Sequence, residues 1–84
     1  MKKSLYSAEQ RVLQDLLRRL RTEAGLRQEE VAARLKTYQT FVSKYEAGER
    51  ILDLPELGQV CEALGITLGD FVAKYEQELR NQKE

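Results

Sequence analysis

Five segments of this 84-residue chain repeat apolar residues at three- and four-residue spacing, and only short turns separate them. Such spacing gathers the apolar side chains on one face of an α-helix, whereas a half-buried strand alternates apolar and polar residues. No segment alternates as a strand does. The expected helices cover residues 8–24, 28–35, 39–47, 54–64 and 68–79, and residues 80–84 are expected to fray. The sequence therefore predicts an all-α fold of five helices.

The ends of these segments carry residues that typically begin and end helices. Gly25, Gly48 and Gly65 follow the first, third and fourth segments, where a residue in the left-handed conformation commonly ends a helix. Asp53 is expected to cap the fourth helix and Thr67 the fifth. A connection of about three or four residues joins the second and third helices, and this is the spacing of a helix-turn-helix.

The length limits how the chain is organised. Eighty-four residues have room for one domain, which we expect to span residues 1–84. Its core is expected over about residues 13–75, with terminal extensions that are helical or frayed. A hydrophobic share of 42% and a charged share of 33% are ordinary for a folded globular protein.

The composition argues against several kinds of function. Cys61 is the only cysteine and there is no histidine, so an intramolecular disulfide is excluded and a structural metal is not expected. No glycine-rich phosphate loop or separate carboxylate pair is present, which leaves an enzyme the least favoured class and no cofactor expected. No apolar run approaches the roughly 20 residues of a membrane span, and the N-terminus lacks the apolar core of a signal peptide. The cytoplasm is therefore the expected location.

Charge divides the chain into unlike halves although the net charge is zero. Residues 1–50 carry 11 basic and 7 acidic side chains, whereas residues 51–84 carry 3 basic and 7 acidic ones. Such asymmetry can orient a protein on an anionic partner, but by itself it is weak evidence for DNA binding.

The third predicted helix has an unusual polar side. A helical wheel assigns its buried side to Tyr38, Phe41, Val42 and Tyr45. The opposite side holds Gln39, Thr40, Ser43, Lys44 and Ala47, with no acid among them. Glutamine, lysine and threonine suit the edges of base pairs in a major groove. Composition alone is equally consistent with an ordinary solvated helix face.

Several motifs in a fixed order resemble the helix-turn-helix domain of the phage repressor and Cro family, the XRE-type regulators. They are LRRLR at 17–21, GL at 25–26, QEEVA at 28–32, VSKYEAG at 42–48 and LGQVCEALGITLGDF at 57–71. Together they extend from Leu17 to Phe71, about two-thirds of the chain. The resemblance implies a five-helix lambda-repressor-like DNA-binding domain, with its helix-turn-helix at the second and third helices.

The resemblance also implies roles for particular residues. Gln28 is expected to anchor a DNA phosphate at the start of the second helix, where free backbone N–H groups attract an anion. Base contacts are expected from Gln39, Thr40, Ser43 and Lys44. Arg21 and Glu46 match a pair that forms a structural salt bridge between helices. Further phosphate contacts are expected from Arg27, Lys36 and Arg50, for each of which a solvated charge is an equal alternative.

Three residues depart from the family pattern. Arg27 replaces the usual Ser or Thr cap of the second helix, Lys36 replaces the turn glycine, and Tyr38 replaces a common Ser cap of the third helix. Lys36 must therefore either adopt a left-handed conformation or give the turn another shape. The docking angle of the third helix is the property that these departures affect most.

The expected function is that of a sequence-specific, double-stranded DNA-binding repressor that acts as a homodimer through its C-terminal helix region. Tyr75 and Leu79 extend the apolar stripe of the fifth helix, and they can pack either on the first helix or on a second subunit, with Leu5 and Tyr6 nearby. Two alternatives stay open at this level. One is an antitoxin or operon controller with a protein partner, and the other is a protein-interaction module on the same fold.

Overall fold

The computed structural model describes residues 7–82, and within this range all regular structure is helical. Its elements are α1 (Ala8–Glu23), α2 (Gln28–Leu35), α3 (Gln39–Ala47), α4 (Leu54–Leu64) and α5 (Leu68–Gln82). The predicted all-α, five-helix fold is therefore confirmed. The predicted packing of Leu5 and Tyr6 concerns residues outside the described range.

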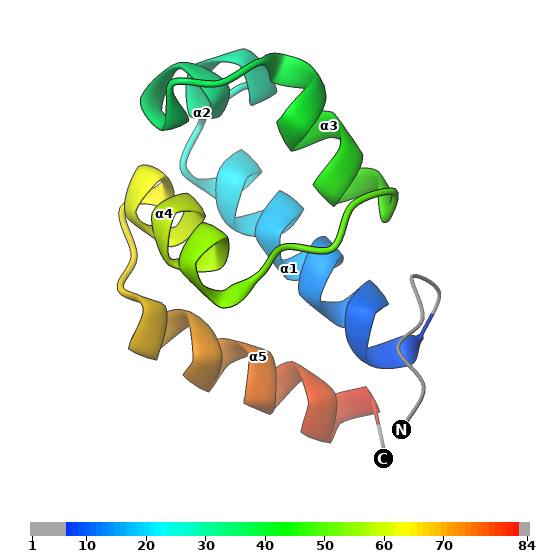
Figure 1. Cartoon of the computed structure of the whole chain (residues 1–84). Helices are drawn as coiled ribbons and strands as arrows, with labels where there is room; N and C mark the ends of the chain where they lie inside the picture. The colour runs from blue at the N-terminus through cyan, green and yellow to red at the C-terminus, as the bar shows by residue number, and fades with distance from the viewer. Residues whose placement is uncertain (1–6, 83–84) are drawn as a thin grey trace.

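Every helix contributes to one hydrophobic core. Figure 1 shows α1 passing through the middle of the bundle, with α2 and α3 above it in this view, α4 to the left and α5 running below it. The buried apolar residues are Leu16, Leu17, Val31, Ala32, Val42, Tyr45, Val60, Cys61, Ala63, Leu64 and Phe71. Cys61 is fully buried, and burial raises the pKa of its thiol to about 11. The core thus fixes the mutual placement of α2 and α3 through the helices beneath them.

The predicted helix caps are present. The Asp53 carboxylate accepts a hydrogen bond from the backbone N–H of Glu56 (2.8 Å), and the Glu56 carboxylate accepts one from the backbone N–H of Asp53 (3.0 Å). Thr67 Oγ1 accepts from the backbone N–H of Asp70 (3.0 Å). The reciprocal pair at Asp53 and the single bond at Thr67 satisfy N–H groups that the start of a helix leaves without partners.

The structure corrects three details of the helix predictions. Ala24 lies after the end of α1 as its exposed C-cap. Tyr38 is 82% exposed instead of buried, because it is the extended N-cap of α3 and a helical wheel does not apply to it. Residues 80–82 are helical instead of frayed, and α5 is held on α1 by a bond from Arg19 to Glu78 (2.7 Å) and one from the Tyr75 hydroxyl to the Glu9 carbonyl (3.2 Å).

The turn after α2 contains a residue that has the left-handed conformation although it is not a glycine. Lys36 has φ 57° and ψ 44°, the only positive φ of a non-glycine residue in the part of the chain described. Its backbone N–H donates to the Ala33 carbonyl (3.1 Å), and that of Thr37 donates to the Ala32 carbonyl (3.0 Å). Of the two alternatives at this position, the chain takes the glycine-like geometry with a lysine.

None of the helices found between residues 7 and 82 is long and apolar enough to cross a membrane.

We expect Lys36→Gly to stabilise the protein by about 0.5 to 1 kcal/mol, because glycine removes the crowding that a Cβ meets in the left-handed region. Lys36→Ala is the matched control, since it removes the same charge and keeps the Cβ. The free energy of unfolding from urea titrations measures both. Equal stabilities of the two variants would show that Lys36 is not strained.

We also expect Glu56 to make stability depend on pH. Its pKa is lowered by the hydrogen bond from the Asp53 backbone and by Arg50, so its charged form stabilises the fold above the ordinary glutamate pKa. This contribution is lost as the pH falls through the lowered pKa. Glu56→Gln should therefore cost about 0.5 to 1 kcal/mol at pH 7 and much less near pH 3. Urea titrations at both values test this, with Glu62→Gln on the same helix as control, and a constant difference would contradict it.

Candidate nucleic-acid interface

The second and third helices form a compact helix-turn-helix. Lys36, Thr37 and Tyr38 connect α2 to α3, and the two helices pack closely at one end of the molecule (Figure 1). The backbone N–H of Phe41 donates to the Tyr38 carbonyl (3.0 Å), so α3 begins directly after the turn. The turn and the core beneath it together set the direction of α3.

One side of α3 is held in the core and the other faces solvent. Val42 and Tyr45 are buried, and the ring of half-buried Phe41 packs edge-on against Tyr45 with 5.7 Å between centroids. The exposed residues of the helix are Gln39, Thr40, Lys44 and Ala47, while Ser43 is half-buried. Three of the four residues predicted to contact bases are thus exposed to solvent, and Ser43 lies at their edge.

Glu46 is the one acidic residue of α3, and it is directed into the molecule. It is 5% exposed, and its carboxylate accepts hydrogen bonds from Arg21 Nε (2.6 Å) and from the second terminal nitrogen of Arg21 (3.0 Å). Arg21 also donates to the Leu26 carbonyl (2.8 Å), and the hydrogen bond to Glu46 raises its pKa. This is the salt bridge between α1 and α3 that the resemblance implies, and it removes the negative charge from the outer face of α3.

Two glutamines form a chain of hydrogen bonds from this ion pair to the surface. Gln28 Nε2 donates to Glu46 Oε1 (3.0 Å), and Gln39 Nε2 donates to Gln28 Oε1 (2.6 Å). Gln28 is the first residue of α2 and Gln39 the first of α3. The start of α2 therefore lies beside the start of α3, which brings a predicted phosphate-binding residue next to a predicted base-reading one.

The other predicted phosphate contacts differ in their accessibility. The Arg27 side chain is 76% exposed and lies 3.3 Å from the Glu30 carboxylate, which also accepts from the Arg27 backbone N–H (2.9 Å). Lys36 is exposed at the turn. Arg50 is paired with Glu56 and lies over the Phe41 ring at 4.9 Å. Lys36 is therefore ready for an anion, whereas Arg27 and Arg50 would each first have to exchange a carboxylate partner.

The sequence interpretation did not single out two further arginines. Arg18 Nε lies 3.8 Å from Glu46 Oε1 while its side chain remains 62% exposed, which adds a cation beside the glutamines. Arg18 and Arg21 are three residues apart, so they lie on the same face of α1. This spacing could have indicated Arg18 from the sequence. Arg34 donates to the Ala63 carbonyl (2.8 Å), and no sequence pattern could have indicated this long-range contact between α2 and α4.

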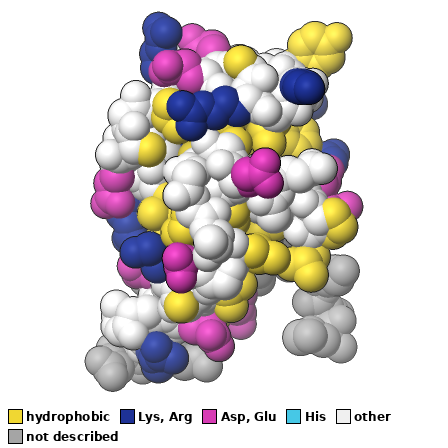
Figure 2. Space-filling view, turned by 90° about the vertical axis from the view of Figure 1, so that its left-hand side faces the viewer, with side chains coloured by type: hydrophobic (Ala, Val, Ile, Leu, Met, Phe, Trp, Pro, Cys, Tyr) yellow, Lys and Arg dark blue, Asp and Glu magenta, His cyan; other side chains and the backbone are white. Residues whose placement is uncertain are grey.

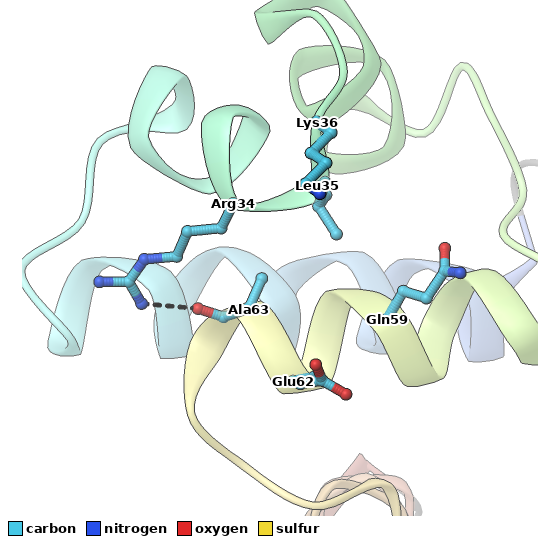
Figure 3. A pocket seen from close by; sticks show the side chains of 6 residues that line it. All are labelled: Arg34, Leu35, Lys36, Gln59, Glu62 and Ala63. Carbon is cyan, nitrogen blue, oxygen red and sulfur yellow. Dashed lines mark hydrogen bonds between the residues drawn. The ribbon is translucent and has the colours of Figure 1, made fainter.

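Arg34 borders an open groove between α2 and α4. The groove has a volume of about 350 Å³, and its lining includes Lys36 from the turn after α2 and Gln59 and Glu62 from α4. Figure 3 shows Arg34 directed at the Ala63 carbonyl. On the neighbouring face in Figure 2, basic and acidic side chains alternate and no broad area carries one sign. The outer side of α3, in contrast, exposes Gln39, Thr40 and Lys44 without a carboxylate.

Comparison with known proteins identifies the family. Residues 13–73 match the family model of a helix-turn-helix domain. The solved structure of an XRE-family-like protein from Pseudomonas syringae pv. tomato str. DC3000 is 41% identical in sequence, with a TM-score of 0.79 over 84% of this chain and 87% of that chain. This chain belongs to the XRE-type helix-turn-helix family.

Two more distant structures share the fold of this XRE-type protein. The wild-type restriction-modification controller protein C.Esp1396I is 21% identical, with a TM-score of 0.83 over 89% of this chain and 97% of that chain. The clp gene regulator ClgR from Corynebacterium glutamicum is 23% identical, with a TM-score of 0.79 over 92% of this chain and 82% of that chain. A search of curated proteins found no match. The family and the fold together support a DNA-binding transcriptional regulator.

We expect Glu46→Gln to destabilise the XRE-type protein by about 3 kcal/mol, because Arg21 would keep its charge in a largely buried site without a counter-ion. Glu23→Gln is the matched control. Glu23 pairs with Arg19 at the surface, where its side chain is 64% exposed, so its loss should cost less than about 1 kcal/mol. Urea titrations at pH 7 give both free energies of unfolding. Similar costs for the two substitutions would contradict the central role of the buried pair.

Proposed function

We propose that this protein is a sequence-specific, double-stranded DNA-binding repressor that occupies an inverted-repeat operator as a homodimer. The observation that carries the proposal is the outer side of α3, which presents Gln39, Thr40 and Lys44 to solvent while the only acid of the helix is buried against Arg21. A helix with such a face fits a major groove, where an exposed carboxylate would be repelled by the phosphates on both sides.

The base-reading residues have complementary chemistry. Gln39 can pair with adenine through two hydrogen bonds, Lys44 can donate to guanine, and the methyl group of Thr40 can contact the methyl group of thymine. Ser43, which is half-buried at the border of this set, can donate to either kind of base or to a phosphate. These four residues from a single helix would read a short half-site.

Phosphate contacts would fix the helix in its groove. Gln28 begins α2, whose free N–H groups and dipole favour an anion. Exposed Arg27 and Lys36 stand at the two ends of α2, and Arg18 adds an exposed guanidinium beside Gln28. Arg50 would contribute only by leaving Glu56, so we assign it the weakest contact.

A homodimer would supply the second half-site, about 34 Å along the duplex. Tyr75 and Glu78 of α5 hydrogen-bond to α1 of the same chain, so this part of the α5 surface is not available to a second copy. Val72 on α5 remains 39% exposed and Leu54 at the start of α4 remains 64% exposed, which leaves apolar contacts for a second copy. The controller protein C.Esp1396I, which has this fold with a TM-score of 0.80, has been solved as a tetramer in complex with its natural 35-base-pair operator.

The first experiment is selection of the purified protein against randomised duplex DNA at near-physiological salt, together with sedimentation analysis of the free protein. We expect an inverted repeat with half-sites about 10 base pairs apart, and a dimer in solution. Enrichment of single half-sites would contradict the dimer. No enrichment at any salt would overturn sequence-specific DNA binding and favour the protein-interaction module. Capture of a protein whose gene lies beside the gene of this protein would favour the operon controller.

Single substitutions then separate base contacts from phosphate contacts. Lys44→Ala should cost about 1 to 3 kcal/mol at the selected site and relax the preference at one base position. Arg27→Ala should weaken binding to all sequences alike and lower the salt dependence. Lys74→Ala, which removes an exposed lysine from α5, is the control and should change neither. Binding titrations against matched duplexes measure these effects, and an unchanged preference in Lys44→Ala would exclude α3 as the reader.

A further inference from the structure

The groove between α2 and α4 carries opposite charges on its two walls. Arg34 and Lys36 come from the end of α2, whereas Gln59 and Glu62 come from α4 (Figure 3). All four residues are exposed, and the volume of about 350 Å³ is within the size range of small-molecule sites. The groove is therefore large enough for a small molecule that bears both charges.

The two cations of the groove are not neutralised by a neighbouring acid. Among the residues described, no carboxylate lies within 4.0 Å of Arg34 or Lys36. Glu30, one helical turn before Arg34, is instead held by Arg27 at 3.3 Å. A carboxylate does lie within 4.0 Å of several other arginines, namely Arg18, Arg19, Arg21, Arg27 and Arg50. The groove thus keeps its positive charges for an anionic group.

Arg34 is also fixed in place by the protein. Its Nη1 donates to the Ala63 carbonyl (2.8 Å), which lies in the last turn of α4, where helix carbonyls lack partners within the helix. A guanidinium carries several N–H donors, so others remain for a carboxylate. Within residues 7–82, Glu62 of the opposite wall has no cation within 4.0 Å. A ligand with a carboxylate and an ammonium group would therefore pair with both walls.

The surface between these charges is apolar. Leu35 is half-buried and Ala63 is 8% exposed, and both line the groove. Leu35 and Gln59 also line an adjoining groove of about 190 Å³, whose lining includes Phe41 and Val60. An apolar side chain that starts over Ala63 can continue along Leu35 toward Phe41. The lining thus suits a molecule that carries an apolar group beside its charges.

We propose that the groove between α2 and α4 is a binding site for a free α-amino acid with an apolar side chain. Its carboxylate would pair with Arg34 and Lys36, and its ammonium group would pair with Glu62. Gln59 can donate or accept a further hydrogen bond, and the apolar side chain would lie on Leu35. An amino acid joins these three features at one carbon atom, whereas a dicarboxylate would bring a like charge to Glu62.

Lys36 connects this groove with the predicted DNA-facing surface. It lies in the turn before α3 with φ 57°, lines the groove and is one of the predicted phosphate contacts. A carboxylate that pairs with its ammonium group would compete with a DNA phosphate for the same cation. The bound amino acid should therefore weaken binding to DNA. This consequence rests on the proposed function, whereas the binding site itself does not.

Binding is tested by titrating the isotope-labelled protein with L-leucine and following its backbone amide signals by NMR. We expect saturable shifts of the residues that line the groove, with a dissociation constant on the order of 1 mM for so small a ligand. N-acetyl-L-leucine lacks the ammonium group and L-leucinamide lacks the carboxylate, so each should bind about fivefold more weakly. Shifts that do not saturate would overturn the site, and an analogue that binds as well as leucine would overturn the corresponding contact.

Two substitutions each remove the charge of one wall residue. Arg34→Gln and Glu62→Gln should each weaken leucine binding by about fivefold. Arg80→Gln and Glu76→Gln, which remove exposed charges from α5, are the matched controls and should leave leucine binding unchanged. Because Glu62 is exposed, Glu62→Gln decides the question if Arg34→Gln does not fold. Leucine binding at the wild-type affinity in Glu62→Gln would overturn the proposed pairing.

The effect on DNA is measured separately, by titrating the protein with its selected duplex without leucine and with leucine at about ten times its dissociation constant. We expect leucine to weaken DNA binding by about three- to tenfold, and L-leucinamide at the same concentration to have less effect. Saturable leucine binding with unchanged DNA affinity would overturn the competition at Lys36. If the wild type selects no duplex, the proposed function fails, whereas the NMR titration still decides whether the groove binds an amino acid.

Discussion

The carboxylate of Glu46 joins three of the five helices at one point. It belongs to α3, accepts two hydrogen bonds from Arg21 of α1 and accepts another from Gln28 of α2. A single charge buried in this way would be costly, and the surrounding donors offset that cost only while the three helices keep their positions. The angle between α2 and α3, and hence the direction of the outer face of α3, depends on this contact as well as on the apolar core.

The same contact connects fold and function. Because Glu46 is turned inward, the outer side of α3 exposes Lys44 and carries no acid, although the net charge of the chain is zero. The buried pair also leads through Gln28 to Gln39 at the surface.

Local chemistry was predicted well where it depends on nearby residues. Asp53 and Thr67 cap α4 and α5 as expected, because a cap requires only a suitable side chain and an N–H group three residues away. Tyr38 shows the limit of this approach. A helical wheel assigned it to the core, but the residue precedes the first turn of α3 in an extended conformation and is exposed. The helical wheel and the N-cap position gave different predictions for this residue, because periodicity is least informative at a helix boundary.

By itself, the sequence determined the five helices, the helix-turn-helix spacing and the residues available on the outer side of α3, because apolar periodicity and capping are local properties. The family resemblance supplied the Arg21 and Glu46 pair. Only the tertiary structure decided that Gln28 lies between Glu46 and Gln39, that Arg50 is occupied by Glu56, and that Tyr75 and Glu78 pack on α1 of the same chain. Each of these contacts joins side chains of different elements, and hydrogen-bond direction and charge pairing at such points depend on distances that only packing sets.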